Sequence, residues 1–127
     1  MQNYKMKRKP IHTYDIDRQP IVLIPLGGKC VSGQFAKLLE EDYNDLLSKG
    51  YSPNWCVNED GSGRNQYVTL YCRITRTQTT ISRLIIEPTK RQVIRYYDGN
   101  SLNLRRDNLY LEDRKKHIQK VLGKHND

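Results

Sequence analysis

The sequence lacks the patterns typical of disulfide-stabilised, zinc-binding, secreted or membrane-spanning proteins. Its three cysteines, Cys30, Cys56 and Cys72, are odd in number and widely spaced, with no Cys-x-x-Cys pair. This argues against a disulfide framework and against a thiolate zinc site. No apolar run approaches the length of a membrane span, and no apolar segment follows the basic N-terminus as it would in a secretory signal. We therefore expect a cytoplasmic protein in a reducing compartment, with no membrane partner.

Tryptophan and phenylalanine are also scarce. The chain has nine tyrosines but a single tryptophan and a single phenylalanine, so its core should be more aromatic-polar than aliphatic, although the Leu, Ile and Val runs are long enough to anchor a small fold. With 127 residues, it is expected to form one domain, or two very small ones that share a core. Internal repeats and low-complexity tracts are absent.

Charge is what the sequence has in excess. Its 22 Lys and Arg residues outnumber 14 Asp and Glu residues, for a formal net charge of +8. The acidic residues crowd positions 40–45, whereas the basic ones crowd 5–9, 73–95 and 105–120. An uneven positive charge favours a polyanion as partner, and DNA is the partner we expect. The alternative is a basic surface that only aids solubility.

The first half of the chain predicts a small sheet-plus-helix unit. Residues 1–20 are polar, basic and interrupted by proline, and we expect a flexible arm there. Ile21–Leu26 is a buried strand candidate that ends at a Gly-Gly pair. A helix is expected next, ending near Gly50, from the helical spacing of Phe35, Leu38, Leu39, Tyr43, Leu46 and Leu47.

Three further strands are expected between residues 55 and 80. They cover Trp55–Val57, Tyr67–Arg73 and a less regular Ile74–Thr80, with the first two joined by a hairpin loop at 58–63. In the middle strand the residues alternate between an apolar face and an aromatic-basic face. The aromatic-basic face, with Arg64 and Arg76 nearby, can enter the major groove as a ribbon. It can equally be an outer face that another segment covers.

The last third predicts a short helix, two strands and a final helix. Thr79–Ile86 suits a short helix stopped by Pro88, and a strand at 93–97 leads into the turn Asp98-Gly99-Asn100. Tyr110-Leu111 is expected to be extended. Asp113 is a suitable N-cap for a final helix that packs through Ile118, Val121 and Leu122.

The segment Val93–Leu109 resembles the motif of HNH endonucleases of the phage and intron-homing type. The shared features are a strand that ends in Asp98-Gly99-Asn100, the following Leu102-Asn103-Leu104-Arg105, and Asn108-Leu109. Upstream, Ile24-Pro25-Leu26, Glu41-Asp42-Tyr43 and the strand at Trp55 resemble the three-stranded DNA-binding domain of plant ethylene-response factors, which often precedes an HNH module in phage proteins.

This resemblance implies an α+β fold, with a small antiparallel three-stranded sheet packed on a helix and then a degenerate ββα unit of the HNH type. It divides the chain into an arm at 1–20, a DNA-binding part at 21–80, and an HNH-like unit with a C-terminal helix at 81–127.

The resemblance also shows what has been lost from the site. The family's general-base His falls on Tyr96, its metal-binding Asp on Arg95, and a further His on Ser82; Asn108 and His117 occupy its remaining metal-binding positions. An unperturbed tyrosine titrates near pH 10, so it is a poor base, and arginine repels a cation. We therefore expect no catalytic residue and no cofactor. Mg²⁺ or Mn²⁺ would be needed only if nuclease activity were retained.

The same substitutions suit phosphate binding. The expected DNA-binding residues are Arg73, Arg83, Arg95, Tyr96, Asn100, Arg105, Arg106, Arg114, Lys115 and Lys116. Two alternatives remain for the polar motif residues, because Asn100 and Asn108 can simply cap turns and His117 can be an ordinary exposed histidine.

The sequence thus predicts a catalytically inactive HNH-like protein, encoded by a phage or mobile element, that binds duplex DNA through backbone phosphates and would associate with the nucleoid. Two other functions stay open: an active metal-dependent nuclease with a rearranged site, and an inhibitor or adaptor that binds a host nucleic-acid-processing or defence complex. The oligomeric state is left open.

Overall fold

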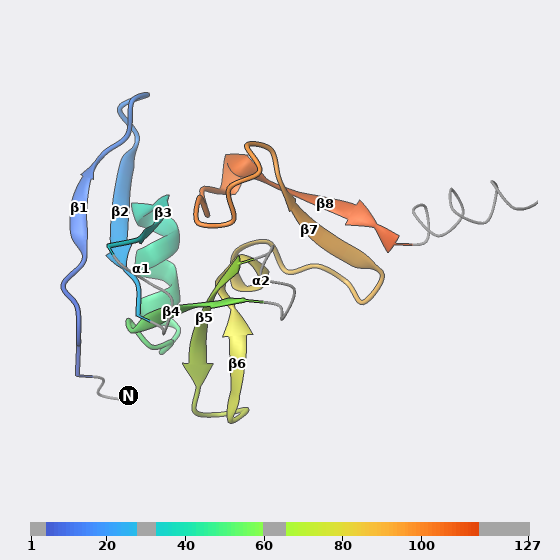
Figure 1. Cartoon of the computed structure of the whole chain (residues 1–127), viewed down its shortest axis with the longest axis horizontal. Helices are drawn as coiled ribbons and strands as arrows, with labels where there is room; N and C mark the ends of the chain where they lie inside the picture. Colours follow the sequence, from blue (N-terminus) through green and yellow to red (C-terminus); the bar gives the residue numbers. More distant parts are fainter. Residues whose placement is uncertain (1–4, 28–32, 60–65, 115–127) are drawn as a thin grey trace, which may run out of the picture.

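The fold is α+β, with short strands in small antiparallel sheets and, among the residues that the structure describes, the helices α1 and α2 (Figure 1). A computed structural model describes residues 5–27, 33–59 and 66–114. In these ranges the elements are β1 Ile11–Tyr14, β2 Pro20–Pro25, β3 Phe35–Leu39, α1 Glu40–Ser48, β4 Trp55–Glu59, β5 Gln66–Cys72, β6 Thr77–Thr80, α2 Ile81–Ile86, β7 Gln92–Tyr96, the 3-10 turn η1 Arg106–Asn108 and β8 Leu109–Asp113.

The first sheet has the order β1-β2-β3, and its β1 strand corrects our expectation for residues 1–20. Ile11–Tyr14 pairs antiparallel with β2, from Ile11 opposite Leu23 to Tyr14 opposite Pro20. Arg8 also donates hydrogen bonds to the carbonyl oxygens of Pro25 (3.1 Å) and Trp55 (3.2 Å). The described part of this segment is therefore packed on the rest of the fold. The expected domain boundary between residues 20 and 21 would separate β1 from nearly all of its partner strand β2.

The first part of the segment at 35–47, which the apolar spacing predicted to be helical, forms a strand instead. Phe35–Leu39 forms β3, which pairs with β2 and buries Ala36 and Leu38 on alternate positions. The helix starts at Glu40, where three acidic residues occupy the first turn and interact favourably with the helix dipole. It ends at Ser48, and Gly50 follows with a φ of 89°, as the expected stop.

The second sheet has the order β4-β5-β6 and confirms the expected strands at 55 and 67. In β5, Val68, Leu70 and Cys72 are buried, while Tyr67 and Tyr71 are exposed. Thr69 departs from this alternation because it is buried and its hydroxyl accepts a hydrogen bond from Asn58. The third expected strand is shorter than 74–80 and covers Thr77–Thr80. Much of the expected hairpin loop, and Arg64, lies outside the described residues.

The last sheet is a two-stranded ribbon, β7-β8, reached through α2. The short helix before Pro88 and the extended segment at 110–111 are both confirmed. The connection between β7 and β8 is tied to the first sheet, because the backbone of Lys37 exchanges hydrogen bonds with Leu102 (2.9 Å) and Leu104 (2.6 Å). Arg114 starts a helix, but the rest of the expected final helix lies outside the described residues.

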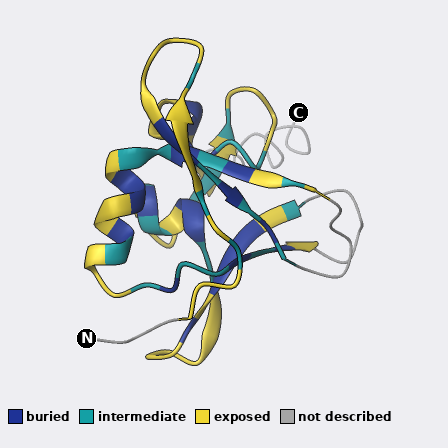
Figure 2. Cartoon of the chain, turned by 90° about the vertical axis from the view of Figure 1, so that its left-hand side faces the viewer, coloured by how far each residue is buried: buried dark blue, intermediate teal, exposed yellow. Residues whose placement is uncertain are grey.

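One core serves all three sheets (Figure 2). Trp55, Val22 and Leu38 are fully buried together with Ile81 and Leu104 from the second half of the chain. The expected boundary at 80/81 therefore falls within a single packed core. In the described part of the chain, neither helix has the length and apolar character that crossing a membrane requires.

Candidate nucleic-acid interface

A groove of about 590 Å³ lies where the second sheet, α2 and the β7–β8 ribbon meet. Helix α2 contacts β5, β6 and β8, so it forms the connection between the two walls. The residues that line the groove come from four segments of the chain: Tyr67, Gln78, Thr79, Thr80, Ser82, Arg83, Val93, Ile94, Arg95, Tyr96 and Arg114. Four of the expected DNA-binding residues, Arg83, Arg95, Tyr96 and Arg114, are thus brought together.

The groove is cationic. Arg83, Arg95 and Arg114 line it, and none of the described lining residues carries a carboxylate. Outside the lining, the carboxylate of Glu112 lies 2.8 Å from Nε of Arg95. Both side chains of this pair are well exposed, at 50% and 40% of their surface. An ion pair in that setting is weak, so an incoming phosphate can compete with Glu112 for Arg95.

Tyr96 and Ser82, where the resemblance led us to expect the lost histidines, lie side by side in the groove. The hydroxyl of Tyr96 donates to Oγ of Ser82 at 3.3 Å, and Ser82 is buried. Burial raises the pKa of the Tyr96 phenol; the hydrogen bond to Ser82 opposes this shift, and nearby Tyr67 adds to it. Tyr96 therefore stays protonated at neutral pH, where it can donate a hydrogen bond but cannot take a proton from water.

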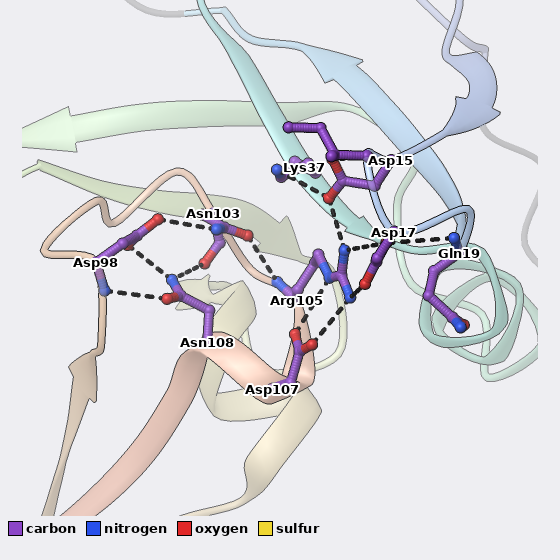
Figure 3. Close-up of polar contacts among 10 residues, drawn as sticks. Asp15, Asp17, Gln19, Lys37, Asp98, Asn103, Arg105, Asp107 and Asn108 are labelled. Atoms are coloured by element: carbon purple, nitrogen blue, oxygen red, sulfur yellow. Dashed lines mark hydrogen bonds and ion pairs between the residues drawn. The ribbon is translucent and has the colours of Figure 1, made fainter.

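Asn108 holds the turn that follows β7 (Figure 3). Its side-chain oxygen accepts from the backbone N–H of Asp98 (3.1 Å), and its amide group donates to Oδ1 of Asp98 and to the carbonyl of Asn103, both at 2.9 Å. Burial would raise the pKa of Asp98, but hydrogen bonds from Asn103, Asn100 and Asn108 lower it below its ordinary value. These contacts favour the turn-stabilising alternative for Asn108 over a metal ligand.

Asn100 has the same local role. Its backbone N–H donates to Oδ1 of Asp98 (2.8 Å), and its own side-chain oxygen accepts from the N–H of Leu102 (3.0 Å). Such bonds two residues along the chain are typical of Asx turns. Gly99, with a φ of 72°, supplies the left-handed position between them. Asn100 is not among the residues that line the groove.

Arg105 is the clearest correction to the expected DNA contacts (Figure 3). The residue is 8% exposed, and its guanidinium donates to Asp15 (2.6 Å), to Asp17 (2.7 and 3.0 Å) and to Asp107 (2.9 and 3.1 Å). All of its side-chain nitrogens are thus engaged by carboxylates, which leaves no free donor for a phosphate. Asp15 and Asp17 stand out as an acidic pair within an otherwise basic N-terminal segment, but nothing in the sequence connects that pair to Arg105.

The other expected contacts lie elsewhere or outside the described residues. Arg106 is half exposed and donates to the buried carboxylate of Asp42 at 3.0 Å, in a separate cleft beside α1. Arg73 is exposed at the end of β5 and does not line the groove. Lys115, Lys116 and His117 lie outside the described residues. Among those that are described, no cluster of three or more His, Cys, Asp or Glu side chains suits a metal ion.

Sequence reasoning pointed to the aromatic-basic face that carries Tyr67 but missed Gln78 and Thr80 beside it, and it missed an aromatic pair next to the groove. Tyr67, Gln78 and Thr80 share the outer face of the second sheet and turn it into one wall. Tyr97 and Tyr110 stack on the ribbon, with ring centroids 4.4 Å apart. Comparisons with protein-family models, with curated proteins and with solved structures found no match, so functional interpretation starts from these residues.

Proposed function

We propose that this protein binds DNA through the groove between α2, the second sheet and the β7–β8 ribbon, without cleaving it. The observation that carries the proposal is the convergence of Arg83, Arg95 and Arg114 in one groove whose described lining has no carboxylate. Three guanidinium groups can each donate two parallel hydrogen bonds to phosphate oxygens. Contacts to the DNA backbone supply affinity and position, with little reading of base sequence.

The neutral residues of the groove support the same function. Gln78, Thr79 and Thr80 line it with amide and hydroxyl groups, and these groups commonly contact phosphates and sugars. The overall charge of +8 would draw the protein to DNA at long range.

Absence of cleavage follows from the chemistry at the two key positions. Tyr96 is held in its protonated form, and the positive charge of Arg95 repels a metal ion. The resemblance to HNH nucleases of phages and mobile elements supports an origin in such an element. Its scaffold would keep the shape that fits a DNA backbone, while Arg95 replaces the charge of the metal.

A salt titration of DNA binding tests the proposal. With three phosphate contacts the affinity for a duplex should fall about 40-fold between 50 and 200 mM salt, since each contact contributes about 0.9 to the logarithmic slope. Fluorescence anisotropy with a labelled duplex measures this. Each of Arg83→Gln, Arg95→Gln and Arg114→Gln should weaken binding and reduce the slope by about one.

Arg18→Asn is the matched control. It removes one charge at an exposed position in the β1–β2 turn, outside the groove, and Asn tolerates the φ of 67° found there. This variant should keep the wild-type slope. Equal slopes for the wild type and all three groove variants would contradict the proposal.

Plasmid nicking in Mg²⁺ or Mn²⁺ separates binding from cleavage. We expect none above background. Nicking that disappears in the Arg95→Gln variant would instead assign the groove to an active nuclease.

A further inference from the structure

The outer face of the β7–β8 ribbon carries a stacked pair of tyrosines that the core does not use. Tyr97 is 71% exposed and Tyr110 is 36% exposed. Their rings lie 4.4 Å apart between centroids, at an interplanar angle of 33°. The opposite face of the ribbon supplies the packing, because Ile94, Tyr96 and Leu109 contact the hydrophobic core.

Strand register places this pair next to the groove. Arg95 lies directly opposite Tyr110, and Tyr97 follows Arg95 by two residues, so all three side chains share one face. Pairing continues past β7 through a 2.9 Å hydrogen bond from the N–H of Tyr97 to the carbonyl of Asn108. Tyr97 and Tyr110 are therefore diagonal neighbours, and Arg95 belongs both to their face and to the groove.

The exposed ring of Tyr97 has a chemical consequence. The face of an aromatic ring that its neighbour does not cover can stack on a nucleobase, and such stacking tolerates any base. Bases inside a duplex are already stacked on both sides and cannot reach such a ring. An unpaired base, at an overhang or in a single strand, can reach it.

We infer that the Tyr97–Tyr110 pair stacks an unpaired base of the nucleic acid whose phosphates lie along the arginine groove. The inference rests on the proposed function and narrows the ligand to nucleic acid with unpaired nucleotides. Arg95 joins the two parts of the site, since its guanidinium can hold the phosphate that connects the stacked nucleotide to the strand in the groove.

Three probes of shared sequence test this inference: a blunt duplex, the same duplex with a three-nucleotide overhang, and the overhang strand alone. We expect the two probes with unpaired nucleotides to bind about tenfold more tightly than the blunt duplex. A 2-aminopurine in the overhang should lose fluorescence on binding, as it does when stacked on an aromatic ring.

Side-chain variants identify the stacking residues. Tyr97→Leu keeps apolar bulk on the ribbon but removes the ring, so it should abolish both the preference and the fluorescence change. Tyr97→Phe keeps the ring and should retain both. A urea unfolding curve for each variant checks that the ribbon remains folded.

The outcomes of this experiment separate the two proposals. If no probe binds, the proposed function fails. If all three probes bind equally, or if Tyr97→Leu keeps the wild-type preference, DNA binding stands and the stacking inference is overturned. The stacking inference is also overturned by a third outcome, in which Tyr97→Leu leaves all probe affinities unchanged but abolishes capture of a protein from nuclease-treated lysate. In that case the tyrosines would form a protein-docking surface.

Discussion

A basic residue can serve either the fold or a ligand, and Arg105 and Arg95 illustrate the difference. Arg105 is buried among three carboxylates, and hydrogen bonds to Asp17 and Asp15 raise the pKa of its guanidinium above the ordinary value. Arg95 is half exposed and has one exposed partner, Glu112. The first arginine has no spare donor, whereas the second can exchange its partner for a phosphate.

Replacing Arg105 should therefore cost stability. Arg105→Met preserves much of the side-chain volume but leaves Asp17 and Asp107 without their cation, and leaves Asp15 with Lys37 alone. Breaking a buried ion pair costs about 3–5 kcal/mol. Asp17 and Asp107 can regain water because they are at least half exposed, so we expect a loss of about 2–3 kcal/mol in the free energy of unfolding, measured by urea denaturation.

Arg95→Met provides the control for this measurement. It removes an equally short ion pair whose members are both exposed, and such pairs contribute less than about 1 kcal/mol. A similar loss of stability in the two variants would show that the carboxylate cluster around Arg105 contributes little to the fold.

At the level of elements, the connection between β7 and β8 is held in one conformation by side-chain hydrogen bonds and by a buried leucine. Asp98, Asn103 and Asn108 bind one another and close the turn, and Leu104 buries its side chain completely while its backbone pairs with β3. The polar residues of this turn thus fix the path of the connection, and the ribbon in turn positions Arg95 and Tyr96 in the groove.

Two substitutions at Asn108 distinguish this role from metal binding. Asn108→Ala removes three hydrogen bonds from a buried site and should lower the free energy of unfolding by about 2 kcal/mol. Asn108→Asp also brings a second negative charge against Asp98, so it should be more damaging at pH 7. If Asn108 held Mg²⁺, an Asp there would bind the ion better, and added Mg²⁺ would stabilise that variant. We expect no such effect in thermal unfolding with and without Mg²⁺.

Much of the element pattern could be predicted from the sequence, because local signals and tertiary packing agreed there. The alternation in β5, the short helix before Pro88, and the turn at Asp98-Gly99-Asn100 are examples. Helical spacing was misleading at Phe35–Leu39, since Ala36 and Leu38 also fit the two-residue period of a strand. The acidic triplet at 40–42 was the better sign of a helix start.

The candidate site was predicted only in part, because its composition depends on contacts between distant segments. Arg95 and Tyr96, proposed from their places in a motif, both line the groove. Two of the three partners of Arg105, Asp15 and Asp17, are 90 and 88 residues away in the chain, so sequence spacing gave no indication that this arginine was already engaged. The sheet wall of the groove likewise depends on how β5 and β6 lie against the ribbon.

At the scale of the molecule, the two ends of the described chain are joined. Asp15 and Asp17, in the turn between β1 and β2, bind Arg105 from the connection before β8, and Lys37 of β3 also contacts Asp15 at 3.0 Å. Together with the shared core, this junction links the N-terminal hairpin to the ribbon that carries the candidate site. We therefore expect the hairpin and the ribbon to unfold together.

Acid should weaken this junction. Hydrogen bonds from Arg105 and Lys37 lower the pKa of Asp15 from 3.8 to about 2. A carboxyl group whose pKa is lower in the folded than in the unfolded protein stabilises the fold above its unfolded pKa, and this contribution disappears as the pH falls through the folded value. The contribution of Asp15 should accordingly be complete above about pH 5 and be lost between pH 5 and pH 2. Solvent around the cluster limits it to about 1 kcal/mol.

Asp15→Asn isolates the effect from that of other carboxyl groups, such as Asp98, whose pKa is also lowered. The variant should be less stable than the wild type at pH 7, and the difference between them should shrink toward pH 2 because protonation removes the same charge from the wild type. Urea unfolding at several pH values measures the free energy of unfolding of both proteins. Tryptophan fluorescence follows the core, and near-ultraviolet circular dichroism follows the tyrosines. If the difference in the free energy of unfolding between wild type and variant stayed constant across this range, the charge of Asp15 would contribute nothing to the junction. If the fluorescence and circular dichroism transitions of the wild type separated at pH 7, the ribbon would fold independently of the hairpin.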